Sequence, residues 1–130
     1  VHFTDVRPDS TTADALAQAS AQIAETVSVS GVVIFTGSGS TARRVARERP
    51  RVPMLVLTPS PKIARKMALL WGTHAVHTKD IGSFEEMIAK GKRMALRHGF
   101  GEAGSRLVML AEVPFGTPGT TNALRVANVK

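Results

Sequence analysis

Short apolar segments that suit buried strands alternate with helical segments along most of the chain, and this alternation restricts the fold more than any other feature. The strands predicted in this alternating part are Val32–Phe35, Met54–Thr58, His74–His77 and Arg106–Glu112. Each of the first three is followed by a segment with helix caps or helical apolar spacing. Helices between successive strands return the chain in the same direction, so the pattern predicts a mainly parallel sheet with helices on both faces.

Caps and apolar spacing define the predicted helices. They are expected over about Ala13–Val27, over Thr41–Arg49, from Pro61 to a residue before Gly72, and from the Ser83 cap through Arg97. Pro50 and Pro53 close the second of these helices because proline cannot continue a helix. The third begins with Ser60 as its cap, followed by a proline at the first helical position.

In the C-terminal segment Asn122–Val129, Ala123, Arg125, Ala127 and Val129 alternate with Leu124, Val126 and Asn128. This alternation is typical of a strand, so the segment is expected to be the final strand. The connection before it, Pro114–Thr121, is rich in glycine and proline and short enough for a hairpin, so this strand should run antiparallel to its neighbour. It should also lie at the edge of the sheet. The predicted fold is a three-layer α/β/α domain with a five-stranded, mainly parallel sheet and an antiparallel last strand.

The length of 130 residues fits a single domain over residues 1–130, with residues 1–12 as an extended lead-in. Hydrophobic residues make up 43% of the chain, but the apolar runs fall well short of the roughly 20 residues that cross a bilayer, so we expect a soluble protein. The absence of cysteine excludes disulfides and thiolate metal sites, and no signal peptide opens the sequence. These features favour a cytoplasmic protein without a membrane partner.

A turn rich in glycine and hydroxyl side chains, Thr36–Thr41, joins the first predicted strand to a basic helix. Glycine lets the backbone approach an anion closely, and the first amides of a helix have no partner within the helix. The positive end of the helix dipole faces the same point, and Ser38, Ser40 and Thr41 would add hydroxyl donors. The pattern predicts a phosphate-binding turn, with a tight turn that binds no ligand as the alternative.

The net charge of +7 is concentrated directly after this turn. Residues 41–66 contain eight basic residues and one acidic residue, whereas residues 1–40 contain one basic and four acidic residues. A basic field beside free backbone amides favours a small phosphorylated ligand, unless the charges only cover two solvated helix faces. Because the chain has no tyrosine, only 5% aromatic residues and no basic tail, nucleic acid is disfavoured as the partner.

The turn also satisfies the first half of the dinucleotide-binding fingerprint, as Gly37-x-Gly39-x-x-Ala42. The second half requires an acidic residue at the end of the next strand, where this chain has Leu57–Ser60. No Gly-Lys-Ser/Thr sequence follows the turn, which disfavours a nucleotide-hydrolysing phosphate loop. Neither nucleotide motif is therefore complete.

Other residues with catalytic or metal-binding potential form no convincing site in the sequence. The four histidines lack a carboxylate or cysteine at ligand spacing, so no metal is expected; they are His2, His74, His77 and His98. Glu85, Glu86 and Glu102 are expected on solvated surface, and Ser38 has no candidate base for nucleophilic catalysis. Trp71 is expected in the core or at an interface rather than beside a ligand.

Several segments, taken in order, resemble the C-terminal domain of pyruvate kinase. The segments that carry the resemblance are Val32–Ala42, Arg47–Thr58, Ile63–Arg65, Trp71–Gly72, His98–Phe100 and Gly119–Val126. The match covers nearly the whole chain from Ala13 onward. The resemblance implies the fold that the strand and helix pattern also predicts, a five-stranded, mainly parallel sheet with an antiparallel last strand.

The resemblance also implies where the activity of such a protein lies. In pyruvate kinases, phosphoenolpyruvate and ADP react with magnesium and potassium in a separate barrel domain, whose catalytic lysine and carboxylates have no counterpart in this sequence. The resemblance therefore implies a chain without catalytic residues or cofactor of its own, attached to a catalytic barrel in a phosphotransferase. The last strand, Asn122–Val129, is expected to join subunits of a homo-oligomer.

In the resembled family, the C-terminal domain carries an allosteric site for phosphorylated effectors. By resemblance, its residues here are Thr36, Ser38, Gly39, Ser40, Thr41, Gly116, Thr117, Gly119 and Thr120. Forms activated by fructose 1,6-bisphosphate have basic residues at about the positions of Ser40 and Met87, and the loop Pro114–Thr120 lacks their tryptophan and arginine. A monophosphate, such as a hexose or pentose phosphate or AMP, is therefore the expected effector. The alternatives are a domain without an effector and a free-standing α/β protein that binds or acts on a phosphorylated small molecule.

Overall fold

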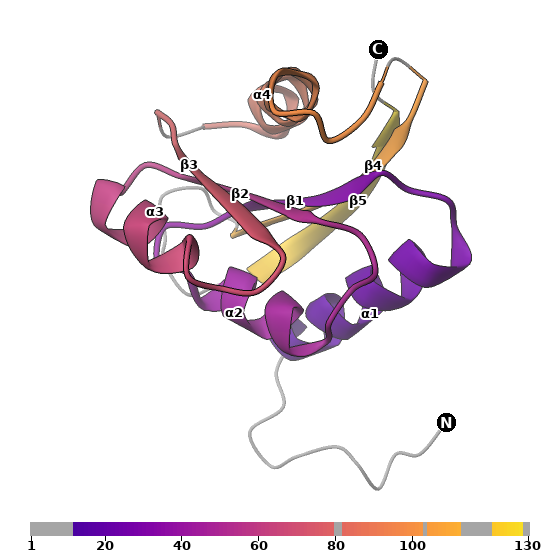
Figure 1. The fold of residues 1–130 in the computed structure, drawn as a ribbon, viewed down its shortest axis with the longest axis horizontal. Helices are drawn as coiled ribbons and strands as arrows, with labels where there is room; N and C mark the ends of the chain where they lie inside the picture. Colours follow the sequence, from indigo (N-terminus) through magenta and orange to yellow (C-terminus); the bar gives the residue numbers. More distant parts are fainter. Residues whose placement is uncertain (1–11, 80–81, 103, 113–120, 129–130) are drawn as a thin grey trace, which may run out of the picture.

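A computed structural model describes residues 12–79, 82–102, 104–112 and 121–128 of the chain (Figure 1). The elements follow in the order α1 (Thr12–Thr26), β1 (Gly31–Phe35), α2 (Ser40–Arg47), β2 (Met54–Thr58), α3 (Pro61–Met67), β3 (Thr73–His77), α4 (Phe84–Arg97), β4 (Arg106–Glu112) and β5 (Thr121–Asn128). The predicted lead-in over residues 1–12 lies outside the described residues apart from Thr12, which begins α1.

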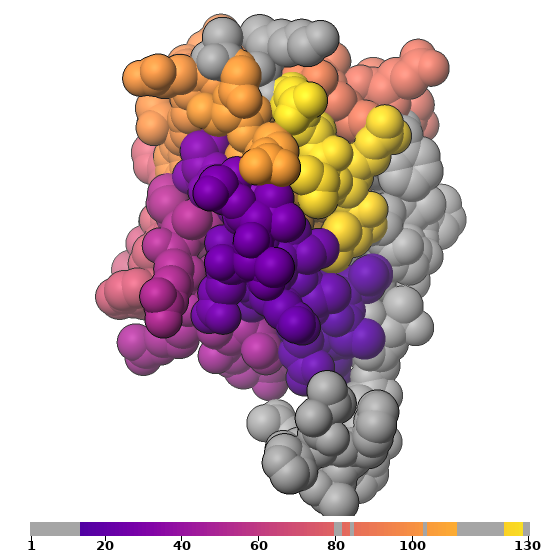
Figure 2. All heavy atoms as spheres, turned by 90° about the vertical axis from the view of Figure 1, so that its right-hand side faces the viewer, coloured from indigo at the N-terminus to yellow at the C-terminus, as the bar shows by residue number. Residues whose placement is uncertain are grey.

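The five strands form one sheet in the order β3-β2-β1-β4-β5. β1 pairs in parallel with β2 and with β4, and β2 pairs in parallel with β3. β5 pairs antiparallel with β4 and lies at the edge, with its outer side at the molecular surface beside α1 (Figure 2). The predicted three-layer fold and its antiparallel edge strand are thus confirmed.

The two faces of the sheet build two separate cores because successive strand residues point in opposite directions. On one face α4 is the helix that covers the sheet among the described residues, and the core there includes Val33, Leu55, Met87 and Met109. On the other face lie α1, α2 and α3, and that core includes Ile34, Val45, Val56 and Leu110. Since β1 and β2 are covered on both faces, all ten of their residues are buried, as their uninterrupted apolar runs require.

The second and third helices are shorter than the sequence pattern predicts. α2 ends at Arg47 because the chain turns sharply there: the amide of Arg49 donates to the carbonyl of Ala46, and Arg49 has a φ of 50°. α3 ends at Met67, and the amide of Leu70 donates to the Met67 carbonyl in a tighter turn. The C-terminal ends of α2 and α3 thus both close with a backbone hydrogen bond between residues three apart. The periodicity of apolar side chains does not distinguish such a turn from a continuing helix.

The connections of the sheet reverse direction at β1. From β1 the chain passes through α2 to β2 on one side, whereas from β3 it passes through α4 to β4 on the other side of β1. Helices α2 and α4 consequently lie on opposite faces. In open α/β sheets of this kind, ligands bind outside the carboxyl ends of the strands where the order reverses. The turn after Phe35 lies at that edge, next to the end of β4 at Ala111.

Candidate functional site

The turn between β1 and α2 is held by the side chain of Thr36. Its Oγ1 accepts a hydrogen bond of 2.8 Å from the amide of Gly39, and this bond is buried. Gly39 is the N-cap of α2 with a φ of 87°, so the cap carries no side chain that could accept from the first helical amides. A Cβ at this position would lie 2.8 Å from Cε of the buried Met67. Both the left-handed backbone and the close packing require glycine here.

Two serine hydroxyls lie together in this turn. The Oγ atoms of Ser38 and Ser40 are 3.0 Å apart, and the Ser38 Oγ accepts from the Ser40 amide at 3.2 Å. Both residues are half-buried. The pair therefore offers hydroxyl donors beside the amino-terminal end of α2, where the helix dipole favours negative charge.

The two threonines that the predicted site has in this turn are buried instead. Thr36 is 3% exposed and Thr41 is 1% exposed, and the Thr36 hydroxyl is committed to the turn. Of the predicted site, the turn residues are thus brought together, with Ser38 and Ser40 nearest to solvent. The other four predicted residues lie outside the described part of the chain; they are Gly116, Thr117, Gly119 and Thr120.

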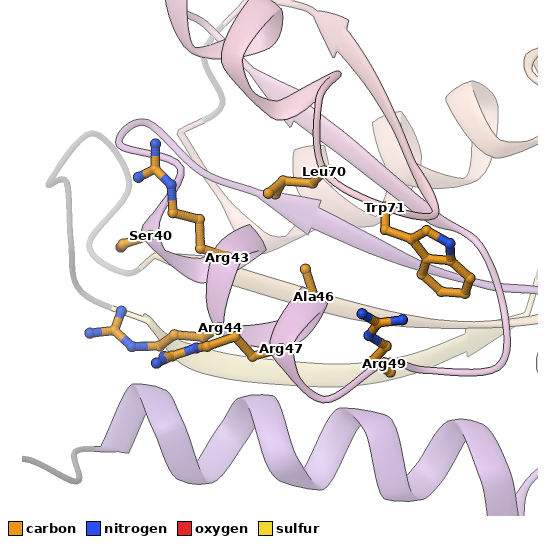
Figure 3. Close-up of a pocket in the computed structure, with 8 residues that line it drawn as sticks. All are labelled: Ser40, Arg43, Arg44, Ala46, Arg47, Arg49, Leu70 and Trp71. Atoms are coloured by element: carbon orange, nitrogen blue, oxygen red, sulfur yellow. The ribbon is translucent and has the colours of Figure 1, made fainter.

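A groove of about 740 Å³ runs along α2 from Ser40 to the turn that follows α3 (Figure 3). It is lined by Ser40, Arg43, Arg44, Ala46, Arg47, Arg49, Leu70 and Trp71. Trp71 is 66% exposed, so of its two expected positions, in the core or at an interface, the core is excluded. Four of the eight basic residues between positions 41 and 66 therefore line one concave surface, which has an aromatic ring at one end.

The arginines of the groove differ in their partners. Arg44 donates through Nε to Oδ1 of Asp14 on α1 at 2.9 Å, and Nη2 of Arg47 lies 3.6 Å from the same oxygen. Nη1 of Arg44 is buried and has no hydrogen-bond partner in the described part of the chain. The guanidinium of Arg49 instead lies over the Trp71 ring, 5.4 Å from its centroid, and it approaches the ring from the α2–β2 connection (Figure 3). Such a pair is a cation–π contact.

A histidine pair lies on the opposite face of the sheet. Nε2 of His74, on β3, is 3.1 Å from Nδ1 of His98, which caps the C-terminus of α4. Burial lowers the pKa of His98, and the neighbouring His74 and Arg97 lower it further. His77 lies apart from this pair, with its Nε2 3.1 Å from the carbonyl oxygen of Pro59.

The glutamates singled out in the sequence lie on the surface. Glu85, Glu86 and Glu102 are exposed, as expected. Among the described residues, no group of three or more histidine and carboxylate side chains could hold a metal ion. Within the described ranges, none of the helices combines the length and the apolar character needed to cross a membrane.

Comparison with known proteins decides the family. The family model for the pyruvate kinase alpha/beta domain matches residues 14–127. The chain belongs to this family. A pyruvate kinase of Methylorubrum extorquens is 41% identical over 122 residues, which are 94% of this chain and 26% of that protein. Pyruvate kinases of Clostridium acetobutylicum and Agrobacterium vitis are each 37% identical and align with 92% and 86% of the chain.

The resemblance to pyruvate kinase predicted from the sequence is therefore confirmed. The chain spans about a quarter of the length of these pyruvate kinases: 26%, 25% and 24% of the three proteins. The matched residues 14–127 contain all nine elements of the described structure except the first residues of α1 and the last of β5. Family membership thus applies to the whole α/β/α unit, including the β1–α2 turn.

Proposed function

We propose that this chain is the regulatory and oligomerisation domain of a pyruvate kinase, and that a phosphorylated small molecule binds at the β1–α2 turn as its effector. The family and the names of its relatives support the first part. In the parent enzyme, phosphoryl transfer from phosphoenolpyruvate to ADP takes place with magnesium and potassium in a separate barrel domain. The chain's own contribution is to bind the effector and other subunits in the cytoplasm, not to catalyse.

One observation carries the effector site: the N-cap Gly39 has no side chain over the start of α2, and the paired hydroxyls of Ser38 and Ser40 lie there, with the Ser38 Oγ accepting from the Ser40 amide. The left-handed Gly39 makes this possible, because it removes the side chain that would otherwise cover the amides. The turn also lies at the carboxyl edge of the sheet where the strand order reverses. Three independent features therefore favour an anion at one point.

The chemistry of the turn fits a monophosphate, such as a sugar phosphate or AMP. Phosphate oxygens would accept from the hydroxyls of Ser38 and Ser40 and from backbone amides, as the buried Thr36 keeps the turn in shape. Each charge-assisted hydrogen bond contributes about 1.5–3 kcal/mol where water is largely excluded. Three or four such bonds, after the cost of association is subtracted, are compatible with micromolar to millimolar affinity.

Calorimetry with ligands that carry no base tests this site: inorganic phosphate, glucose 6-phosphate and ribose 5-phosphate. We expect at least one sugar phosphate to bind to the wild-type chain and Ser38→Asp to abolish that binding. The aspartate can still accept from the Ser40 amide, so the turn should keep its shape while the new carboxylate repels the phosphate. Ser40→Ala should weaken binding by about fivefold, because it removes one hydroxyl donor.

Ser28→Asp is the matched control, since Ser28 is exposed in the connection before β1, at the amino-terminal edge of the sheet. It adds the same charge far from the turn and should leave affinity unchanged. The proposal fails if no ligand binds below about 10 mM, a limit weaker than the millimolar affinity expected. It fails equally if Ser38→Asp binds as well as the wild type.

A further inference from the structure

Two histidines from distant parts of the chain meet at the edge of the sheet. β3 is the edge strand next to β2, and α4 lies above one face of the sheet (Figure 1). In the β2–β3 register His74 lies beside Leu55, whose side chain belongs to the core under α4, so His74 points to that face as well. Its Nε2 lies 3.1 Å from Nδ1 of His98, at the C-terminal end of α4. The fold thus brings two imidazole nitrogens together across 24 positions of the sequence.

Ordered backbone holds both histidines in place. α4 ends in a Schellman motif, in which the amide of Phe100 donates to the carbonyl of Ala95 at 2.7 Å across Gly99, whose φ is 78°. This motif fixes the backbone of His98, the C-cap of the helix. His74 lies on a paired strand, and its ring centroid is 5.9 Å from that of Phe100. Side chains on a strand and at a capped helix end are positioned more precisely than side chains on a loop.

The distance between the two nitrogens fits a shared metal ion. Bonds from zinc to imidazole nitrogen are about 2.0–2.1 Å long, so two nitrogens 3.1 Å apart subtend an angle of about 95–102° at the metal. This angle lies between the roughly 90° of a square-planar or octahedral site and the roughly 109° of a tetrahedral one. Neutral imidazole suits zinc, copper and nickel, whereas magnesium and calcium prefer oxygen ligands. The pair therefore fits a divalent transition metal ion.

The surroundings of the pair leave room for the other ligands of such an ion. His74 is exposed and His98 is partly exposed, so water can complete the coordination shell. Within the described ranges no third histidine or carboxylate joins them in a metal-binding group, so the protein would supply two ligands. Burial, His74 and Arg97 lower the pKa of His98, which keeps its ring in the neutral form that binds metals. Arg97 also repels a cation, whereas the negative end of the α4 dipole attracts one.

We infer that Nε2 of His74 and Nδ1 of His98 together bind a divalent transition metal ion such as Zn²⁺, which clamps β3 to the C-terminal end of α4. The ion would replace the hydrogen bond between the rings, and the ring protons would then reside on Nδ1 of His74 and Nε2 of His98. The clamp lies on the opposite face of the sheet from α2, so it does not depend on an effector at the β1–α2 turn. Because the fold brings the two nitrogens together, zinc should stabilise the folded state.

Titration of the 130-residue chain with Zn²⁺, followed by NMR of the histidine rings, tests the clamp. The chain has four histidines, so their ring resonances can be assigned one by one from single substitutions. The resonances of His74 and His98 should shift together and saturate at one zinc ion per chain, whereas those of His77 should stay in place. Mg²⁺ at the same concentration should shift none of them, because it prefers oxygen ligands.

Substitutions measured by calorimetry identify the ligands. His74→Gln and His98→Asn each keep a polar atom near the lost ring nitrogen and should weaken zinc binding at least about tenfold. His77→Gln is the matched control, since His77 is an exposed histidine of the same strand that lies three residues further on and points to the other face. It should leave the affinity unchanged, as should His2→Gln, which removes the remaining histidine.

Urea unfolding measures the clamp independently of the binding assay. At a zinc concentration ten times the dissociation constant, the ratio of folded to unfolded wild-type chain should rise about elevenfold. At that same concentration His74→Gln should gain about twofold or less, because it binds zinc at least about tenfold more weakly.

Several results would overturn the clamp. If His74→Gln bound zinc as tightly as the wild type, or if His77→Gln lost as much affinity as His74→Gln, the pair would not be the site. The absence of any shift at about 1 mM Zn²⁺, or an equal response to Mg²⁺, would exclude a transition-metal site here. One zinc ion per two chains, with a dimer that forms only in zinc, would mean that the histidines bind metal between copies and not between β3 and α4.

Discussion

Replacing Gly39 by alanine should destabilise the domain by about 2 kcal/mol. The left-handed φ of 87° costs alanine about 1–2 kcal/mol relative to glycine. The new Cβ would also lie 2.8 Å from Cε of Met67 and 3.1 Å from its Sδ. Because that methionine end is flexible but buried, the overlap adds about 1 kcal/mol, at the low end for overpacking. Reduced freedom of the unfolded chain offsets about 0.5 kcal/mol of this sum.

Gly37→Ala is the matched control in the same turn. Gly37 has no positive φ, and an added Cβ would meet nothing within 4 Å, so only the unfolded-state effect remains. This variant should be as stable as the wild type or more stable by about 0.5 kcal/mol. Urea unfolding followed by far-ultraviolet circular dichroism measures both free energies of unfolding. If Gly39→Ala were as stable as Gly37→Ala, the turn would not require glycine, and the geometric argument for an open helix start would be refuted.

Two further predictions concern other parts of the domain. The pKa of His98 is lowered by burial and then by His74 and Arg97, so the folded state takes up a proton less readily than the unfolded chain. The stability of the fold should therefore be retained above about pH 6.5 and should decrease as the pH falls through that value. Unfolding at pH 7.5 and 5.5 should show a smaller loss for His98→Asn than for the wild type, and an equal loss would contradict the assignment to this residue. The edge strand β5, with Val126 41% exposed, should pair across a two-fold axis with a second copy. Sedimentation should show a dimer that Val126→Asp dissociates, and a monomer at high wild-type concentration would argue against it.

Much of the fold could be predicted because its determinants are local. The apolar runs at Met54–Thr58 and Arg106–Glu112 coincide with β2 and β4 at both ends, since strands covered on both faces have few polar residues. The Ser60 cap and Pro61 correctly located the start of α3. The ends of helices were harder to predict. The turn that ends α2 depends on a left-handed backbone conformation at Arg49, which arginine does not favour.

The candidate site could be predicted only in part. The sequence places Thr36, Ser38 and Ser40 in one turn because they are neighbours, but it does not show which hydroxyls face solvent. In the structure the Thr36 hydroxyl accepts from Gly39, while those of Ser38 and Ser40 contact each other. The sequence signal that could have identified Thr36 as the residue that holds the turn is a threonine followed three residues later by a glycine.

The sequence by itself determined the strand and helix order, the glycine turn and the basic character of α2, since each depends on residues within a few positions of one another. Only the tertiary structure decided what lies beside that helix. β2 and α3 separate Arg49 from Trp71 along the chain, and these two residues meet because α2 and α3 pack on the same face of the sheet. α4 separates His74 from His98, and these two meet because α4 packs on the other face. Local periodicity predicts that a face is buried but not which distant residue it meets, because that depends on how the sheet twists and the helices pack against it.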